Sequence, residues 1–436
     1  MSHSFCIHAW KQLNVLQTGD VAPCCTFKGS LMAEDGLPFS VYRQSLEEIW
    51  NSETMRSMRR DMLAGQWVKG CDFCYQQEAV GCVSVRQEAN AAWRDRERIP
   101  LDIFRSQDVA ADFRPSPPDY LQLTVGTQCN LKCRMCNGGA SSRINLDPVH
   151  RRWAGVEDDA IANGQRWWQQ DRFIRNLFPN PDRLRTLNLI GGEPLIVKEV
   201  GALLQYLINA GVASQVLLEV ATNATTAHAP WLELTRHFRE VILHPSIDGF
   251  GTTYEYIRYP ARWEKLVGNL EKLRQLPKTS LSANVTVQAY NALEIVDLFR
   301  FLDKVRVPFG AYATPYPDHL TIRVLPPRLR RLAAVRLRAY AERDCLDKHR
   351  EMVRALALGL EALEGHWDQS LFHEFMVFTN DLDASRGQSV RTSLPELWEL
   401  IAGLGIEWTT QTRHFQARRD TRENAECADI RVGTIE

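Results

Sequence analysis

From about residue 120 the chain alternates short apolar segments with longer stretches whose apolar residues recur at helical spacing. The apolar segments predict strands at Leu121–Val125, Thr186–Ile190, Val216–Ala221, Val241–Ile247, Leu281–Val287 and Ala311–Ala313. The stretches between them, which include Lys198–Asn209 and Ala261–Leu276, predict helices. This alternation is typical of a parallel α/β sheet. Six such strands predict a partial (β/α)6 TIM-like barrel, in which chemistry lies at the carboxyl ends of the strands.

The chain on either side of this region follows other patterns. Ile7–Trp10 and Asp20–Pro23 flank a Thr-Gly-Asp turn and predict a hairpin, and helical spacing with a serine N-cap predicts a helix over 45–62. Residues 86–118 are charged and end in a proline-rich segment, which predicts a connector. The pattern therefore divides the chain into a small hairpin-plus-helix N-terminal domain (1–85), a linker (86–118), the barrel (119–325) and a mostly helical C-terminal region (326–436).

Composition and charge narrow the classes of function. The chain has 436 residues, of which 44% are hydrophobic and 24% are charged, with a formal net charge of -1. This near-neutral balance argues against a nucleic-acid binder, which needs a basic surface. The sequence starts without a basic segment followed by an apolar one and has no uninterrupted apolar run long enough to span a membrane. We therefore expect a cytoplasmic protein with no membrane partner.

Cysteine is the most informative residue type in this chain. There are 11 cysteines, and most of them lie before residue 137. In a reducing compartment, clustered cysteines indicate metal ligands or catalytic thiols rather than disulfides. Two clusters stand out, one in the N-terminal domain and one directly after the first predicted barrel strand.

The second of these clusters has the spacing C-x3-C-x2-C and consists of Cys129, Cys133 and Cys136. Three thiolates on one tight loop can hold three irons of a four-iron cluster, and the fourth iron then keeps an open coordination position. Open positions on a bound metal are where chemistry takes place. Zinc sites more commonly join two C-x2-C pairs, so the spacing favours iron over zinc.

These residues resemble the radical SAM superfamily, whose fingerprint is C-x3-C-x2-C in the loop after the first barrel strand. Met135 stands where an aromatic residue usually precedes the last cysteine. The segment Gly191-Gly192-Glu193-Pro194 follows the second predicted strand and is similar to the G-G-E motif that holds the amino group of S-adenosylmethionine (SAM) in that family. The resemblance implies further SAM contacts at later strand ends, from Asn223, Ser246, Asp248 and Gln288.

The resemblance also implies a reaction. The open iron would chelate SAM, one electron would break its C5′–S bond, and the 5′-deoxyadenosyl radical would take a hydrogen atom from the substrate. In such an enzyme the cofactor performs the difficult chemistry, and the protein orients the reactants and excludes water. An external electron donor, flavodoxin or ferredoxin, would supply the electron.

The N-terminal cluster consists of Cys6, Cys24 and the C-x2-C pair Cys71 and Cys74. It resembles the twitch domain, the shorter relative of the SPASM domain, which holds an auxiliary [4Fe-4S] cluster with four cysteines. The alternative is a four-thiolate zinc site that stabilises the small domain. Cys25 is a second candidate for the ligand position of Cys24. Cys82 is a weaker candidate, expected to be a spare thiol or a residue that supports the ligands, and Cys345 and Cys427 are expected to be buried or incidental.

Four protein ligands would leave no open iron on the auxiliary cluster, so we expect it to transfer electrons. This favours an oxidation, either a dehydrogenation or an oxidative bond formation. No segment resembles a separate leader-peptide recognition domain, which favours a small metabolite as the substrate. The alternatives are a peptide-modifying enzyme, a redox-neutral epimerase in which a free cysteine returns a hydrogen atom, and, from another class, a zinc-stabilised binding protein without catalytic activity.

Overall fold

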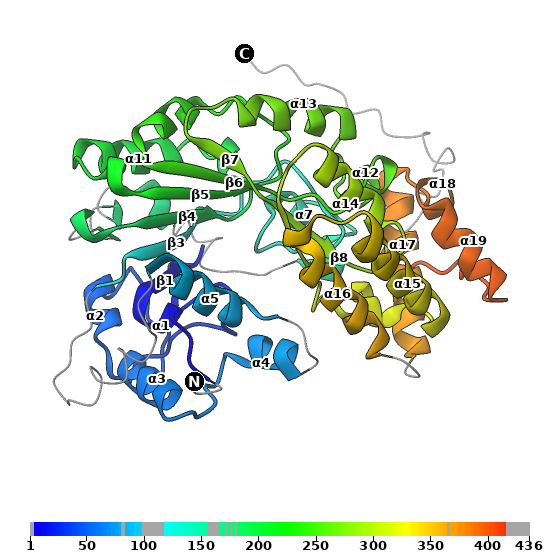
Figure 1. The fold of residues 1–436 in the computed structure, drawn as a ribbon, viewed down its shortest axis with the longest axis horizontal. Helices are drawn as coiled ribbons and strands as arrows, with labels where there is room; N and C mark the ends of the chain where they lie inside the picture. The colour runs from blue at the N-terminus through cyan, green and yellow to red at the C-terminus, as the bar shows by residue number, and fades with distance from the viewer. Residues whose placement is uncertain are drawn as a thin grey trace, which may run out of the picture.

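The computed structural model describes residues 4–79, 83–97, 117–155, 166–170, 173–174, 177–178, 181–363 and 367–415. Figure 1 shows an open sheet beside a mainly helical region, with the N-terminal domain against one edge of the sheet. The described strands form a seven-stranded sheet in the order β2-β1-β3-β4-β5-β6-β7 and a separate pair, β8-β9. The predicted α/β class with a partial, unclosed barrel is therefore confirmed.

The barrel strands lie close to their predicted positions. They are β3 (Tyr120–Thr124), β4 (Thr186–Ile190), β5 (Leu217–Thr222), β6 (Glu240–Pro245), β7 (Thr279–Leu281), β8 (Ala283–Val287) and β9 (Phe309–Ala313). The predicted strand Leu281–Val287 is divided between β7, which pairs with β6, and β8, which pairs with β9. A single parallel bridge between Ser246 and Asn284 connects the two sheets.

The N-terminal domain contains two short strands and several helices. The strands are β1 (Gln12–Val15) and β2 (Val21–Ala22), and the helices are α1 (His8–Lys11), α2 (Leu46–Trp50), α3 (Glu53–Leu63), α4 (Asp72–Ala79) and α5 (Val85–Glu97). The antiparallel hairpin forms, but a strand at Ile7–Trp10 is wrong, because residues 8–11 are helical. Helix α5 explains the difference: Asn90 binds the backbone of Phe5 and Ile7 and fixes the chain before α1.

The predicted helix over 45–62 divides into α2 and α3. Ser45 caps α2 in a reciprocal capping box with Glu48, as its sequence position predicts. Ser52 then caps α3 by accepting a hydrogen bond from the backbone N–H of Met55. A second capping serine only seven positions after the first explains why the helix stops and restarts there. Helix α5 occupies the start of the stretch expected as a connector, and residues 98–116 of that stretch lie outside the described residues.

The hairpin is part of the barrel sheet. Strand β1 pairs in parallel with β3, with Gln12 opposite Tyr120 and Asn14 opposite Gln122. Parallel pairing between segments more than 100 residues apart extends the sheet by two strands and covers the edge that β3 would otherwise expose. The N-terminal domain is therefore joined to the barrel by backbone hydrogen bonds as well as by side-chain packing.

Helices flank the sheet and form the C-terminal region. The barrel helices include α11 (Val200–Asn209), α12 (Thr252–Ile257), α13 (Trp263–Arg274) and α14 (Ile295–Lys304), with the short α7 (Ser142–Asn145) and α8 (Arg151–Ala154) after the cysteine loop. The C-terminal helices are α15 (Pro327–Arg343), α16 (Asp347–Glu361), α17 (Gln369–Arg386), α18 (Val390–Ser393) and α19 (Pro395–Gly403). The predicted helical C-terminal region is thus observed over its described residues.

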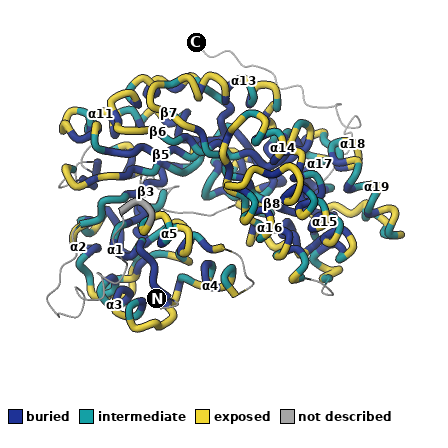
Figure 2. Tube along the Cα trace, in the orientation of Figure 1, coloured by how far each residue is buried: buried dark blue, intermediate teal, exposed yellow. Residues whose placement is uncertain are grey.

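One hydrophobic core runs through the N-terminal hairpin, the barrel strands and the C-terminal helices. Figure 2 shows the strands buried along most of their length, whereas the outer faces of α13 and α19 are exposed. In the described part of the chain, none of the helices combines the length and apolar character needed to cross a bilayer.

Candidate iron–sulfur and cofactor sites

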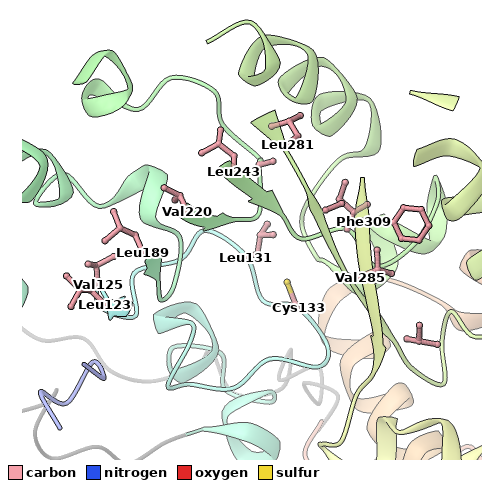
Figure 3. Packing of buried hydrophobic residues seen from close by; sticks show 14 of the residues in the cluster. Leu123, Val125, Leu131, Cys133, Leu189, Val220, Leu243, Leu281, Val285 and Phe309 are labelled. Atoms are coloured by element: carbon pink, nitrogen blue, oxygen red, sulfur yellow. The ribbon is translucent and has the colours of Figure 1, made fainter. Parts of the chain in front are cut away.

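The loop that contains Cys129, Cys133 and Cys136 follows β3 and is held by the end of α12 and the residues directly after it. The backbone N–H of Lys132 donates to the carbonyl of Tyr259 at 2.7 Å, and that of Arg134 donates to the carbonyl of Ile257 at 2.9 Å. The hydroxyl of Ser141 donates to the carbonyl of Leu131 at 2.7 Å. Figure 3 shows Leu131 and Cys133 on this loop. Both belong to the same buried hydrophobic cluster as the aliphatic side chains of the strands.

The three thiols lie close enough to influence one another's ionisation. Burial, together with the charges of Cys136 and Cys129, raises the pKa of Cys133 well above its ordinary value. Burial and the charge of Cys129 raise the pKa of Cys136 to about 11. The structure therefore brings together three thiols whose negative forms repel one another. A bound iron cluster would relieve this repulsion, so the donor set fits a cluster.

The two glycines of the Gly-Gly-Glu segment fit against the backbone of the cysteine loop. A Cβ atom on Gly192 would lie 2.2 Å from the carbonyl oxygen of Gln128, and one on Gly191, whose φ is +136°, would lie 2.7 Å from that of Gly126. The backbone N–H of Gly192 also donates to Gly126, and that of Glu193 to Gln128. Glycine is therefore required at both positions because the segment packs directly against the backbone that precedes Cys129.

Glu193 is fully buried at the end of β4 and has hydrogen-bond donors on both carboxylate oxygens. Oε1 accepts from the hydroxyl of Thr222 at 2.7 Å, and Oε2 accepts from the backbone N–H of Asn223. Burial raises the pKa of Glu193. The side-chain amide of Asn223 donates to Asn130 at 2.8 Å and lies 3.8 Å from the Sγ of Cys129. Glu193 and Asn223, predicted from different strand ends, therefore meet beside the first cysteine.

Asp248 forms a buried ion pair with Arg258. The Nε and Nη2 atoms of Arg258 both lie 2.7 Å from Oδ2 of Asp248, and Oδ1 accepts from the backbone N–H of Thr286. The Nη1 atom of Arg258 lies 3.8 Å from the Sγ of Cys133. The carboxylate of Asp248 thus orients the arginine that faces the second cysteine.

The remaining two predicted residues lie at neighbouring strand ends. Ser246 follows β6, is half-buried, and is the residue that bridges to Asn284. Gln288 follows β8 and is fully buried, and neither polar atom of its side-chain amide has a hydrogen-bond partner among the described residues. A buried amide without partners is uncommon in a folded protein and suits a position that a ligand completes.

The N-terminal cysteines form the second group. Burial and the charge of Cys24 raise the pKa of Cys6, and burial with the charges of Cys24 and Cys74 raises the pKa of Cys71 to about 12. The hydroxyl of Thr26 lies 3.4 Å from the Sγ of Cys24 and 3.7 Å from that of Cys74. The structure therefore brings together the four cysteines that the sequence analysis selected.

Cys25 lies beside this group and is exposed. Burial and the charge of Cys24 raise the pKa of its thiol to about 12. Cys345 is buried, as expected, and its thiol donates to the carbonyl of Leu346. Cys82 and Cys427 lie outside the described residues. As the side chains stand, no group of three or more His, Cys, Asp or Glu among the described residues is arranged around a single metal ion.

The sequence analysis missed the charged residues that anchor the cysteine loop. Arg134, fully buried, donates to Asp383 of α17, to Gln388 and to the carbonyl of Tyr256. Lys132 pairs with Asp147. Both cations lie within the cysteine motif, and this position is a signal in the sequence. Their partners lie up to 254 residues away, so no local pattern identifies them.

A comparison with protein families matches residues 6–75 to the SPASM family, described as an iron–sulfur cluster-binding domain. The match includes Cys6, Cys24, Cys71 and Cys74. A search of the curated proteins finds no match to the chain.

Solved structures similar to this chain include native anSMEcpe with bound AdoMet, at 14% identity and a TM-score of 0.34, covering 51% of this chain and 59% of that one. SuiB of Streptococcus suis is 12% identical with a TM-score of 0.36, covering 76% of this chain and 68% of that one. The chain thus spans less than two thirds of anSMEcpe. The SPASM match agrees with the auxiliary iron–sulfur domain that the N-terminal cysteines predict, because residues 6–75 are similar to an iron–sulfur cluster-binding domain.

Proposed function

We propose that this chain is a radical SAM enzyme that oxidises a small-molecule substrate with the help of an auxiliary iron–sulfur cluster. The observation that carries the proposal is the meeting of Cys129, Cys133 and Cys136 with Glu193 and Asn223 at the carboxyl end of the parallel sheet. The three thiols would hold a [4Fe-4S] cluster. When bound, that cluster supplies the electron that cleaves the C5′–S bond of SAM to give the radical that takes the substrate hydrogen.

The residues around the thiols have distinct tasks in this proposal. The buried carboxylate of Glu193 would bind the amino group of SAM, and its donors from Thr222 and Asn223 fix the orientation of the carboxylate. The unpartnered amide of Gln288 offers both a donor and an acceptor to the cofactor. Arg258 places a positive charge beside Cys133, which favours the thiolate. The surrounding apolar core excludes water from the reacting groups.

The N-terminal group would hold the auxiliary cluster through Cys6, Cys24, Cys71 and Cys74. With a protein ligand for each iron, this cluster is suited to accept an electron from the substrate radical, and this supports an oxidation. Flavodoxin or ferredoxin is the proposed electron donor.

A redox-neutral epimerisation is the second candidate, and Cys25 is the observation that favours it. This thiol is exposed and is a fifth cysteine beside the four proposed ligands, so it stays free when those four hold the cluster. It could return a hydrogen atom to a substrate radical. Product formed in deuterated water would then gain deuterium at the reacting carbon, whereas an oxidation would give a product with two fewer hydrogens.

The test of the proposed function is anaerobic reconstitution of the full chain followed by incubation with SAM and dithionite. We expect about eight irons per chain, from two four-iron clusters, and formation of 5′-deoxyadenosine. Cys133→Ala should abolish 5′-deoxyadenosine, while Cys345→Ala, which changes a buried cysteine outside both groups, should not. Zinc without labile sulfide, and no cleavage of SAM, would instead identify the zinc-stabilised binding protein.

A further inference from the structure

Three cations on or beside the cysteine loop each have a carboxylate partner. Lys132 pairs with Asp147, Arg134 with Asp383, and Arg258 with Asp248. Each of these positive charges is therefore balanced within the protein, as is usual for ions removed from water. Together the three pairs contribute no net charge to the surroundings of the loop.

A fourth cation of this region, Arg386, has no such partner. It lies in the last turn of α17 and is 8% exposed, and its Nη2 atom donates to Nδ1 of His150 at 2.9 Å. Because an arginine can only donate, Nδ1 carries no proton and His150 is neutral. The Nε and Nη1 atoms of Arg386 have no hydrogen-bond partner among the described residues. Within the described part of the chain, this positive charge is thus buried without a negative one.

Contacts from α17 and from the residues after α12 place Arg386 against the cysteine loop. Asp383, one turn earlier on the same face of α17, holds Arg134, which directly follows Cys133. The guanidinium of Arg386 also lies 5.2 Å from the centre of the Tyr259 ring, and the carbonyl of Tyr259 accepts from the backbone N–H of the residue before Cys133. Burial and the charge of Arg134 lower the pKa of Arg386 to about 10, while the charge of Cys133 acts in the opposite direction.

Neither the end of the helix nor the aromatic ring supplies the missing negative charge. The last turn of α17 offers only the partial charge of its free carbonyl groups, and the tyrosine ring has no net charge. Removing a full charge from water costs more than such partial charges offset. The unpartnered nitrogens have almost no exposed surface, so the balancing charge must act across the protein rather than by contact.

We propose that Arg386 is the counter-charge of the iron–sulfur cluster on the cysteine loop and that it makes this cluster easier to reduce. This inference rests on the proposed function and adds to it a residue that acts without touching the reacting atoms. Three thiolates outnumber the two positive charges of an oxidised [4Fe-4S] core, so the assembled site is negative and becomes more negative on reduction. A buried positive charge nearby stabilises the reduced form more than the oxidised form, which raises the reduction potential.

The test is an anaerobic redox titration of the reconstituted full-length protein, followed by electron paramagnetic resonance. The loop cluster is identified as the signal that Cys133→Ala lacks. Arg386→Met keeps much of the side-chain length but removes the charge, so its loop cluster should be reduced at a lower potential. A unit charge acting over about 10 Å at an effective dielectric constant of about 20 shifts an equilibrium by about tenfold. At the wild-type midpoint potential, the ratio of reduced to oxidised loop cluster should therefore fall by about that factor.

Two further variants separate charge from shape. Arg386→Lys keeps a positive charge and should restore most of the wild-type potential. Arg391→Met removes an exposed arginine of α18, whose charge is screened by solvent, and should leave the potential unchanged. The inference is overturned by an unchanged potential in Arg386→Met, by an equal shift in Arg391→Met, or by a lysine variant that shifts as far as the methionine variant.

The stability of the cluster-free chain guards against a merely structural effect. Without a cluster, the charge of Arg386 is unbalanced, so Arg386→Met should unfold at the same urea concentration as the wild type or at a higher one. In the reconstituted protein, by contrast, a chelator should remove iron from the loop of Arg386→Met several times faster than from the wild type. Destabilisation of Arg386→Met in both forms would assign the residue a structural task only and overturn the inference.

The inference and the proposed function fail in different ways. A loop cluster that cleaves SAM but keeps its potential in Arg386→Met overturns this inference alone. A loop cluster that never cleaves SAM overturns the proposed function, while its potential still decides on Arg386. If Cys133→Ala lacks no signal, the loop holds no cluster and both are overturned.

Discussion

At the scale of single residues, Cys24 and Cys25 are adjacent in the chain but have different surroundings. The hydroxyl of Thr26 contacts the Sγ atoms of both Cys24 and Cys74, whereas Cys25 is exposed. We therefore predict that Cys24→Ser loses about half of the roughly eight irons, because one of two four-iron clusters is lost. Cys25→Ser should keep its full iron content. Iron and sulfide analysis after anaerobic reconstitution measures both, and an equal loss in the two variants would contradict the prediction.

Asp147, which pairs with Lys132 of the cysteine loop, is a second residue whose contribution to stability can be tested through its dependence on pH. Burial alone would raise the pKa of its carboxyl, but the bond from Lys132 and the backbone N–H groups of His150 and Val149 outweigh it and lower the pKa. A carboxyl whose pKa is lowered by folding stabilises the protein at any pH above its pKa in the unfolded chain, which is about 3.9. This stabilisation is lost as the pH falls through the lower pKa of the folded state.

We accordingly predict that Asp147→Asn lowers the free energy of unfolding by about 2 kcal/mol at about pH 7, because charged hydrogen bonds are lost. The difference from the wild type should shrink as the pH falls below about 4. Urea titrations at several pH values measure it. A difference that stays constant down to about pH 3 would show that the carboxylate charge is not responsible.

Which of these residue-level features could be read from the sequence depends on how local they are. The spacing of Cys129, Cys133 and Cys136 is local, and it identified a group that the structure brings together. The partners of Arg134 and Gly192 are not local: the arginine pairs with Asp383 of α17, and the glycine is required by the carbonyl of Gln128. Only the folded chain shows contacts of this kind.

At the scale of elements, the barrel strands were predictable because each is a short apolar segment bounded by polar turns. Strand β4 lies at its predicted residues, Thr186–Ile190. The predicted strand at Ile7–Trp10 failed because Asn90 of α5 fixes the backbone before α1, and a local pattern cannot anticipate a partner more than 80 residues away. The parallel pairing of β1 with β3 was missed for the same reason.

Helix α17 connects the C-terminal region to the cysteine loop, and this connection gives an element-scale prediction. Asp383 accepts from Arg134 and Tyr256 through one oxygen and from the backbone N–H of Val390 through the other. Asp383→Asn would leave the fully buried Arg134 without a carboxylate, so we predict a loss of about 3–5 kcal/mol in the free energy of unfolding.

Urea titration measures this loss, and a surface ion pair provides the control. Asp297→Asn breaks the exposed pair with Arg300 and should cost less than about 1 kcal/mol, because such pairs are screened by solvent. We also expect Asp383→Asn to lose iron from the loop cluster more readily than the wild type on incubation with a chelator. Equal stability of the two variants would mean that α17 does not hold the loop.

At the scale of the whole molecule, the two cysteine groups are held in one sheet. Strand β1 lies within the residues that match the SPASM family and pairs with the barrel sheet, so backbone hydrogen bonds fix how far apart the two cysteine groups lie. The pairing of β1 with β3 also involves Gln12 and Asn14, which are both buried in the folded chain. We infer that neither half keeps its structure without the other.

Removal of residues 1–85 tests this inference. The truncated chain would expose the edge of β3 and the apolar surface that the hairpin covers, so we predict that it aggregates and binds no stable cluster. The double variant Gln12→Ala with Asn14→Ala keeps the backbone pairing and should remain monodisperse. Size-exclusion chromatography and iron analysis measure both. A truncated chain that is monomeric, holds about four irons and still cleaves SAM would show that the barrel is independent of the sheet extension.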